Sequence, residues 1–165
     1  RISRALVMSR IRSYQQNATN RVDQMQLRVR VLAARCLPKP KGAKSGEHID
    51  PFVKVTLHDV MERGEGKATY MSASFSTHTV SDNGFCPEWE DKGLKEFTVV
   101  NPQVAMLQFG VKDTDTLGRD DRIADAAIPC NRMRSGYRSV KLYDKNNTRT
   151  GAFGFATLLV QIQIV

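Results

Sequence analysis

Hydrophobic and polar residues alternate with a period of two from Gln26 onward, beginning with Leu27, Val29 and Val31 among arginines. This period is typical of a strand with one face in the protein interior and the other in water. Seven further short segments follow, separated by clusters of Gly, Pro, Asn and Asp, with no strong helix signal between them. The pattern therefore predicts an all-β, antiparallel sandwich or barrel. The eight expected strands are residues 26–32, Phe52–His58, Ala68–Phe75, Glu96–Val100, Met106–Lys112, Arg122–Ile128, Arg138–Tyr143 and Ala156–Val165.

The first 25 residues have a different pattern, which predicts a short helix from Arg1 to about Asn17 followed by a linker. Its apolar residues recur at roughly three- and four-residue intervals, and no carboxylate appears before Asp23. A purely basic helix can lie on an anionic bilayer or an acidic partner, or it can connect domains and pack on a neighbour. We favour the connector. The expected division is 1–25, a basic helix and linker, and 26–165, the β domain.

Composition limits the choice of function without deciding it. The 165 residues suit one domain with a proper core, and the formal charge of +8 favours a polyanionic partner, either anionic lipid or nucleic acid. Aromatic residues make up 7% and the basic residues are scattered, so we expect no nucleic-acid binding. Because the chain opens with Arg1 and shows no signal-like apolar core, we expect a fragment of a longer cytoplasmic protein. The cysteines and histidines form no zinc-binding or acid–base pattern; they are Cys36, Cys86, Cys130, His48, His58 and His78.

Carboxylates gather in the three longest connections, Pro38–Asp50, Thr77–Asp91 and Asp113–Asp121. Asp113 and Asp115 are two residues apart where a strand runs out, so residual strand geometry would aim both to one side. Such an Asp-x-Asp pair is common in surface turns and is weak evidence alone. Asp50 and Asp82 strengthen it, because each stands in another loop. Clustered carboxylates repel one another unless a cation lies between them, and calcium suits mobile oxygen ligands.

Several ordered motifs between Gln26 and Val165 resemble the C2 domain. They are Leu-Arg-Val-Arg-Val-Leu, Ile-Asp-Pro-Phe-Val-Lys-Val, Asp-Asn-Gly-Phe-Cys-Pro-Glu-Trp and Phe-Gly-Val-Lys-Asp-Thr-Asp. The tail, Gly-Tyr-Arg-Ser-Val-Lys-Leu-Tyr and Ala-Thr-Leu-Leu-Val-Gln-Ile, is similar to the C2 domain of phosphoinositide-specific phospholipases C. The resemblance implies an eight-stranded antiparallel β-sandwich with the strand connectivity of the phospholipase subgroup.

The resemblance also implies calcium as the cofactor. Its ligands would be Asp50, Asp82, Asp113, Asp115 and Asp121, with Asp120 able to exchange roles with Asp121 and a backbone carbonyl offered near His48. Where many calcium-dependent members have a further early Asp, this chain has Lys39, Lys41 and Lys44, which we expect to contact lipid. Leu117 is a candidate membrane wedge at a loop tip, whereas Trp89 is expected in the core or at a corner of the sandwich.

The resulting hypothesis is a calcium-dependent phospholipid-binding module that targets a phosphoinositide-specific phospholipase C to membranes. Its partners would be an anionic phospholipid surface and the catalytic domain of the parent enzyme, and its location cytoplasmic and peripheral to the membrane. The chain itself lacks a catalytic constellation, so hydrolysis is expected from the parent phospholipase alone. The alternative is a calcium-independent scaffold that docks on the catalytic barrel of that parent.

Overall fold

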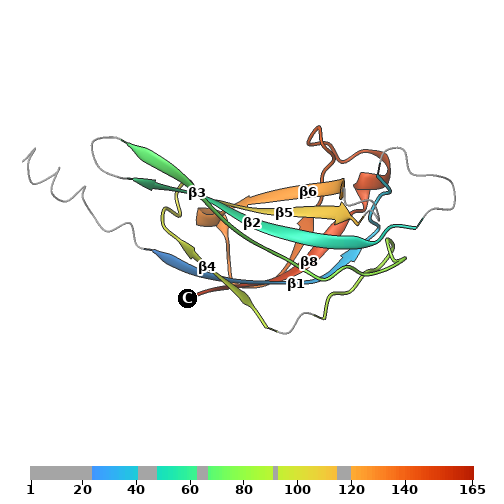
Figure 1. Ribbon diagram of the computed structural model, residues 1–165, viewed down its shortest axis with the longest axis horizontal. Helices are drawn as coiled ribbons and strands as arrows, with labels where there is room; N and C mark the ends of the chain where they lie inside the picture. The colour runs from blue at the N-terminus through green and yellow to red at the C-terminus, as the bar shows by residue number, and fades with distance from the viewer. Residues whose placement is uncertain (1–23, 41–47, 63–66, 91–92, 115–119) are drawn as a thin grey trace, which may run out of the picture.

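The computed structural model describes residues 24–40, 48–62, 67–90, 93–114 and 120–165 (Figure 1). The expected N-terminal helix lies outside these ranges. Eight strands and two short 3-10 helices, η1 and η2, make up the described structure. In chain order they are β1 Met25–Arg35, β2 Pro51–Glu62, β3 Ala68–Ser76, β4 Lys95–Val99, β5 Met106–Asp113, β6 Asp121–Pro129, η1 Cys130–Arg132, β7 Gly136–Lys141, η2 Gly151–Gly154 and β8 Thr157–Ile164.

Two four-stranded antiparallel sheets form the sandwich, with strand orders β4-β1-β8-β7 and β3-β2-β5-β6. The first and last strands, β1 and β8, are neighbours in the middle of one sheet. The prediction of an eight-stranded antiparallel sandwich is therefore confirmed. The expected strand boundaries differ by a few residues; β7, for example, begins at Gly136 and ends at Lys141, two residues earlier than expected at each end.

The core between the sheets consists of the inward-facing residues of the alternating strands. In β1 these are Leu27, Val29 and Val31, all essentially inaccessible to solvent. Trp89 is the largest buried side chain, and only 1% of its surface is exposed. Its main-chain N–H donates to the carbonyl of Leu32, where the pairing of β1 with β8 shifts register, so the segment before β4 lies beside the end of β1. The expectation that Trp89 belongs to the core is thus confirmed.

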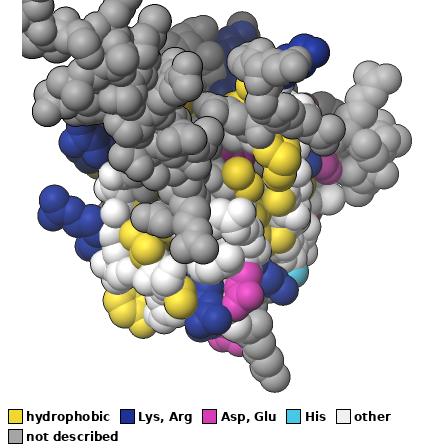
Figure 2. Space-filling model, turned by 90° about the vertical axis from the view of Figure 1, so that its left-hand side faces the viewer, with side chains coloured by type: hydrophobic (Ala, Val, Ile, Leu, Met, Phe, Trp, Pro, Cys, Tyr) yellow, Lys and Arg dark blue, Asp and Glu magenta, His cyan; other side chains and the backbone are white. Residues whose placement is uncertain are grey.

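The two ends of the sandwich carry different connections. One end of the sandwich contains the start of β1 and the C-terminus (Figure 1). The other end contains the start of β2, together with the loops that carry Asp50, Asp82 and Asp113. We call it the loop end, and the other, where β2 finishes and β5 begins, the anchor end. Figure 2 views the molecule from the anchor end, where hydrophobic side chains are interspersed with polar and charged ones over the visible described surface.

A buried carboxylate joins the two sheets at the anchor end. Asp59, near the end of β2, is 3% exposed and accepts the N–H of Val60 at 2.7 Å. It also accepts the N–H of Val100 at 2.6 Å and that of Asn101 at 3.2 Å, both just beyond β4 in the other sheet. A carboxylate that receives several main-chain donors is stable in a buried position, because each donor replaces lost hydration.

Candidate cation and membrane-contact site

Strand pairing brings two of the predicted ligands close together at the loop end. Asp113 ends β5, where its register partner in β2 is Pro51, the residue after Asp50. The main-chain N–H of Asp50 donates to Oδ1 of Asp113 at 2.7 Å, and the carbonyl of Asp50 accepts the N–H of Thr114 at 3.1 Å. The first and third loops are therefore held together by both main-chain and side-chain contacts.

Asp82 joins this pair from the loop between β3 and β4. Its N–H donates to Oδ1 of Asp50 at 2.7 Å. Asp82 lies in the left-handed backbone region, with φ of 54°, which aspartate tolerates better than most residues. The Asp82 side chain is exposed and Asp50 is half-buried. The structure thus brings Asp50, Asp82 and Asp113 to one edge of the sandwich.

Packing behind the carboxylates fixes the loop that carries Asp50. Ile49 is buried, and its side chain lies against Gly84 of the neighbouring loop. A Cβ atom at position 84 would come within 2.5 Å of Ile49 Cγ1, so a larger residue there would require the buried Ile49 side chain to shift. The N–H of Leu37 also donates to the Gly84 carbonyl at 3.0 Å, which ties in the end of β1.

A β-bulge decides which acidic residue of β6 faces Asp113. The β5–β6 register pairs Val111 with Ala124 but Lys112 with Arg122, so Ile123 is the extra residue. Asp121 is consequently opposite Asp113, a position that uninterrupted pairing would give to Arg122. Asp120 is turned toward Lys112, whose Nζ lies 3.8 Å from its Oδ2. The bulge therefore adds a fourth carboxylate of the expected set to this end.

The remaining predicted site residues lie outside the described residues: Asp115 and Leu117 in one loop, Lys41 and Lys44 in another. Lys39 is described and exposed. Within the described ranges, no three acidic, histidine or cysteine side chains are grouped closely enough to hold a metal ion. The oxygen chemistry of Asp50, Asp82, Asp113 and Asp121 fits calcium, which accepts carboxylates and carbonyls from several loops. Their role as ligands stays a prediction.

Two exposed phenylalanines at the loop end were not singled out as membrane contacts from the sequence. Phe85 follows Asp82 in the second loop, and its carbonyl accepts the N–H of Cys36 just past β1. Phe155 stands two residues before β8, whose first residue pairs with Arg35 at the same end. Each has 76% of its surface exposed. Other large apolar side chains are exposed as well, among them Tyr70, Val104 and Tyr137, so exposure alone does not assign Phe85 and Phe155 a role.

A bilayer-crossing helix is missing from the part of the chain that the structure describes, because no helix there has the necessary length and apolarity.

The two sheets form a β-sandwich whose loops bring carboxylates from separate parts of the chain to one edge. A family model described as the C2 domain matches residues 25–145. The chain belongs to the C2 domain family.

Sequence relatives extend the comparison to a group of phosphodiesterases. The chain is 36% identical over 139 residues to rat 1-phosphatidylinositol 4,5-bisphosphate phosphodiesterase delta-1, and 32% identical over 138 residues to mouse delta-3. Each match covers 84% of this chain and 16% of the relative, so the chain spans about one sixth of these relatives. The resemblance to the C2 domains of phosphoinositide-specific phospholipases C is thereby confirmed.

Solved structures agree on the fold. PLC21 of S. officinalis superposes with a TM-score of 0.62 at 20% identity, covering 86% of this chain and 16% of that one. A C2 domain of plant extended synaptotagmin 1 gives a TM-score of 0.57 at 20% identity, covering 88% of this chain and 95% of that one. At these identities the likeness concerns the fold alone.

Proposed function

We propose that this chain is a calcium-dependent phospholipid-binding module with the strand connectivity of the phospholipase subgroup, which brings a phosphoinositide-specific phospholipase C to the membrane. The observation that carries the proposal is the hydrogen-bonded set of Asp50, Asp82 and Asp113, with Asp121 opposite Asp113 across the bulge. Asp50 and Asp113 each use one carboxylate oxygen, Oδ1, to accept a main-chain N–H of a loop residue. The four carboxylates are suited to a divalent cation.

Charge explains how calcium would control docking. Without the cation, the carboxylates repel an anionic bilayer. With calcium held by Asp50, Asp82, Asp113, Asp121 and Asp115, most of the negative charge of this edge is neutralised, and lipid phosphate or carboxylate oxygens can complete the coordination. Because each ligand stabilises the state that binds the other, calcium and lipid raise each other's affinity by the same factor.

Hydrophobic insertion would add to this electrostatic switch. Phe85 and Phe155 are at the same end as the carboxylates, and most of each side chain is accessible. Lys39 adds attraction to anionic headgroups of about 1 kcal/mol for a basic residue near the surface. The loop end thus combines cation ligands, basic charge and apolar side chains, which together favour the interface of a bilayer.

Vesicle cosedimentation with and without calcium tests the proposal. Wild-type chain should sediment with phosphatidylserine vesicles in calcium and stay in solution with a chelator. Asp113→Asn keeps an Oδ1 acceptor for the Asp50 N–H but removes one charge, so apparent calcium affinity should fall by about tenfold or more. The matched control is Glu96→Gln, on the outer face of β4, where only a surface ion pair with Arg28 is lost.

A second candidate is a calcium-independent scaffold that packs on the catalytic barrel of the parent phospholipase. It is supported by the small share, 16%, that this region occupies in the phosphodiesterase relatives. The same experiment separates the two functions. Equal sedimentation of wild type and Asp113→Asn at every calcium concentration would rule out the switch in favour of the scaffold.

A further inference from the structure

A cavity of about 460 Å³ lies at the loop end, beside the acidic edge and distinct from it. Three basic side chains from separate parts of the chain line it: Lys39 after β1, Arg122 in β6, and Lys145 after β7. Ile123 and Phe153 supply an apolar side. The volume is within the range of small-molecule sites and exceeds what a simple ion needs.

The charge of the lining favours an anion. The three basic groups contribute +3, Asp144 is the single acidic residue among the described lining residues, and Asp125 pairs with Arg122 from beside the cavity, which leaves a net charge of +1. Within the described ranges neither lysine has an ion-pair partner. A phosphate monoester carries about −1.5 to −2 charges near neutral pH and offers three strong acceptor oxygens. Its charge is therefore opposite in sign to that of the cavity.

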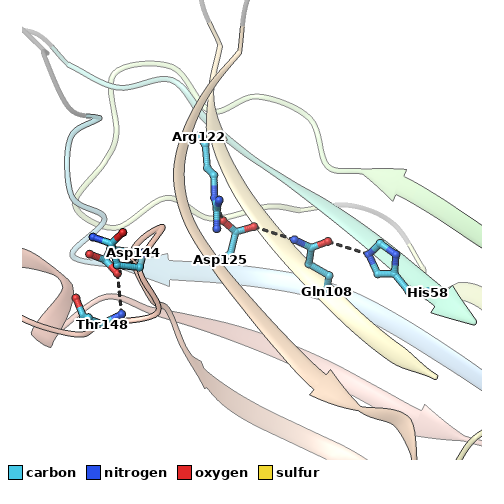
Figure 3. A network of polar contacts seen from close by, with 7 residues as sticks. His58, Gln108, Arg122, Asp125, Asp144 and Thr148 are labelled. Atoms are coloured by element: carbon cyan, nitrogen blue, oxygen red, sulfur yellow. Dashed lines mark hydrogen bonds and ion pairs between the residues drawn. The ribbon is translucent and has the colours of Figure 1, made fainter. Parts of the chain in front are cut away.

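A chain of polar contacts across the outer face of the β3-β2-β5-β6 sheet holds Arg122 in position (Figure 3). His58 Nε2 lies 2.8 Å from Gln108 Oε1, and Gln108 Nε2 donates to Asp125 Oδ1 at 3.1 Å. The other oxygen of Asp125 pairs with Nε of Arg122. Because the pair uses only Nε, the two terminal nitrogens of Arg122 have no partner among the described residues, and they can form a fork for a phosphate.

The turn that carries Lys145 is rigid for a related reason. Asp144 Oδ1 accepts the N–H of Asn146 at 2.9 Å and that of Thr148 at 2.7 Å (Figure 3). The Thr148 N–H is the main reason that the pKa of the Asp144 carboxyl lies below its ordinary value. The Asp144 carboxylate is thus turned into its own loop, and Lys145 and Asn146 are held at the cavity beside it.

We infer that this cavity binds a phosphate monoester, presented by a lipid headgroup, in a calcium-independent manner. Lys39 and Lys145 provide charge, and Arg122 provides the directed contact. That the phosphate belongs to a lipid headgroup rests on the proposed membrane function. That the cavity binds a phosphate monoester at all rests on the cavity alone. The two contributions would act at one end of the molecule, with calcium controlling the acidic edge and phosphate filling the basic cavity.

Two measurements in the presence of a chelator test the inference. In the first, inorganic phosphate is titrated into isotope-labelled chain, and saturable chemical-shift changes are expected at the amides of Lys39, Arg122 and Lys145. In the second, cosedimentation compares phosphatidylcholine vesicles containing phosphatidic acid, a monoester, with vesicles containing phosphatidylglycerol, a diester, at matched surface charge. The wild-type chain should prefer phosphatidic acid.

Substitutions distinguish binding at the cavity from the general attraction of a basic protein to anionic vesicles. Lys39→Ala and Lys145→Ala should each weaken binding to phosphatidic acid vesicles about fivefold, the equivalent of about 1 kcal/mol per basic residue near the surface. Lys95→Ala, an exposed lysine of β4, removes the same charge elsewhere and should have a smaller effect. Equal losses for all three variants would overturn the inference.

The outcomes also distinguish this inference from the proposed function. Phosphate-dependent shifts without a preference for phosphatidic acid would overturn the lipid-borne form and leave a site for soluble phosphate monoesters. Calcium-dependent sedimentation with phosphatidylserine that is unchanged in Lys145→Ala, together with no phosphate shifts, would overturn the phosphate site in the cavity and leave the proposed function intact. Loss of calcium dependence with intact phosphate shifts would overturn the proposed function alone.

Discussion

Strand β2 has an aspartate at each end, and the two residues have opposite environments. Asp59, at the anchor end, is buried, and three main-chain N–H groups donate to it. Asp50, at the loop end, is half-buried and accepts one, from Asp82. The same side chain therefore acts as a structural link where three main-chain donors surround it, and is proposed as a cation ligand where it accepts only one among the described residues.

Distance keeps the two ends electrically separate. Nine residues of extended strand span about 30 Å at 3.3 Å per residue. This is several times the Debye length of about 8 Å at physiological ionic strength. A charge change at the loop end should therefore alter membrane binding with little effect on the anchor end, and the reverse should hold for stability.

The largest expected effect is on folding stability at the anchor end. Asp59→Asn replaces an acceptor by an amide that can turn a donor toward buried N–H groups, so the free energy of unfolding should fall by about 3 kcal/mol. Asp82→Asn makes the same chemical change at an exposed position and should stay within about 0.5 kcal/mol of wild type. Urea denaturation of both variants checks this, and equal effects would remove the distinction between the ends.

A pH effect should also arise at the anchor end. Burial, and secondly the nearby charge of Asp59, raise the pKa of the Cys130 thiol from 9.0 to about 11. Below pH 9 both the folded and unfolded chains hold the proton. Between pH 9 and 11 only the unfolded chain ionises, so this contribution to stability is lost as pH rises, by about 2–3 kcal/mol in total. Urea denaturation measured between pH 9 and 11 should show that the free energy of unfolding declines less steeply with pH in Cys130→Ala than in wild type. The same decline in both proteins would contradict the assignment to Cys130.

Hydrophobic side chains provide a matched test of membrane contact. Phe85→Ala or Phe155→Ala should weaken calcium-dependent vesicle binding by about tenfold, since partial insertion of a phenylalanine contributes part of its burial energy of about 1.5–3 kcal/mol. Val104→Ala removes an exposed apolar side chain from the connection between β4 and β5, at the anchor end, and should leave vesicle binding unchanged. Thermal midpoints measured alongside should stay constant, because none of the three side chains is buried.

The smallest effect is expected at the Asp144 turn. The lowered pKa of this carboxyl means that its contribution to stability is present at neutral pH and is lost as pH falls through the folded-state pKa. Asp144→Ala should lower the thermal midpoint slightly at pH 7, and the difference from wild type should disappear in acid. A difference that persists in acid would show that the turn owes its order to other contacts.

Sequence periodicity gave a good account of the strands and a partial one of the site. The alternation in β1 predicted its inward face correctly, because burial of one face is the origin of the period. The exposure of Phe85 and Phe155 could not be predicted, since an aromatic residue in a loop can be buried or exposed and periodicity carries no information there. Asp59 gave no sequence signal either, because its donors beyond β4 lie about forty residues away.

The sequence by itself determined the eight strands, the hydrophobic core and the presence of carboxylates in three long loops, since these depend on local pattern and composition. Only the tertiary structure decided which residues meet. The bulge at Ile123 puts Asp121 opposite Asp113, where unbroken pairing would put Arg122. One extra residue in one strand thus separates an acidic edge from a basic cavity, because register depends on how two strands pair and not on either strand alone.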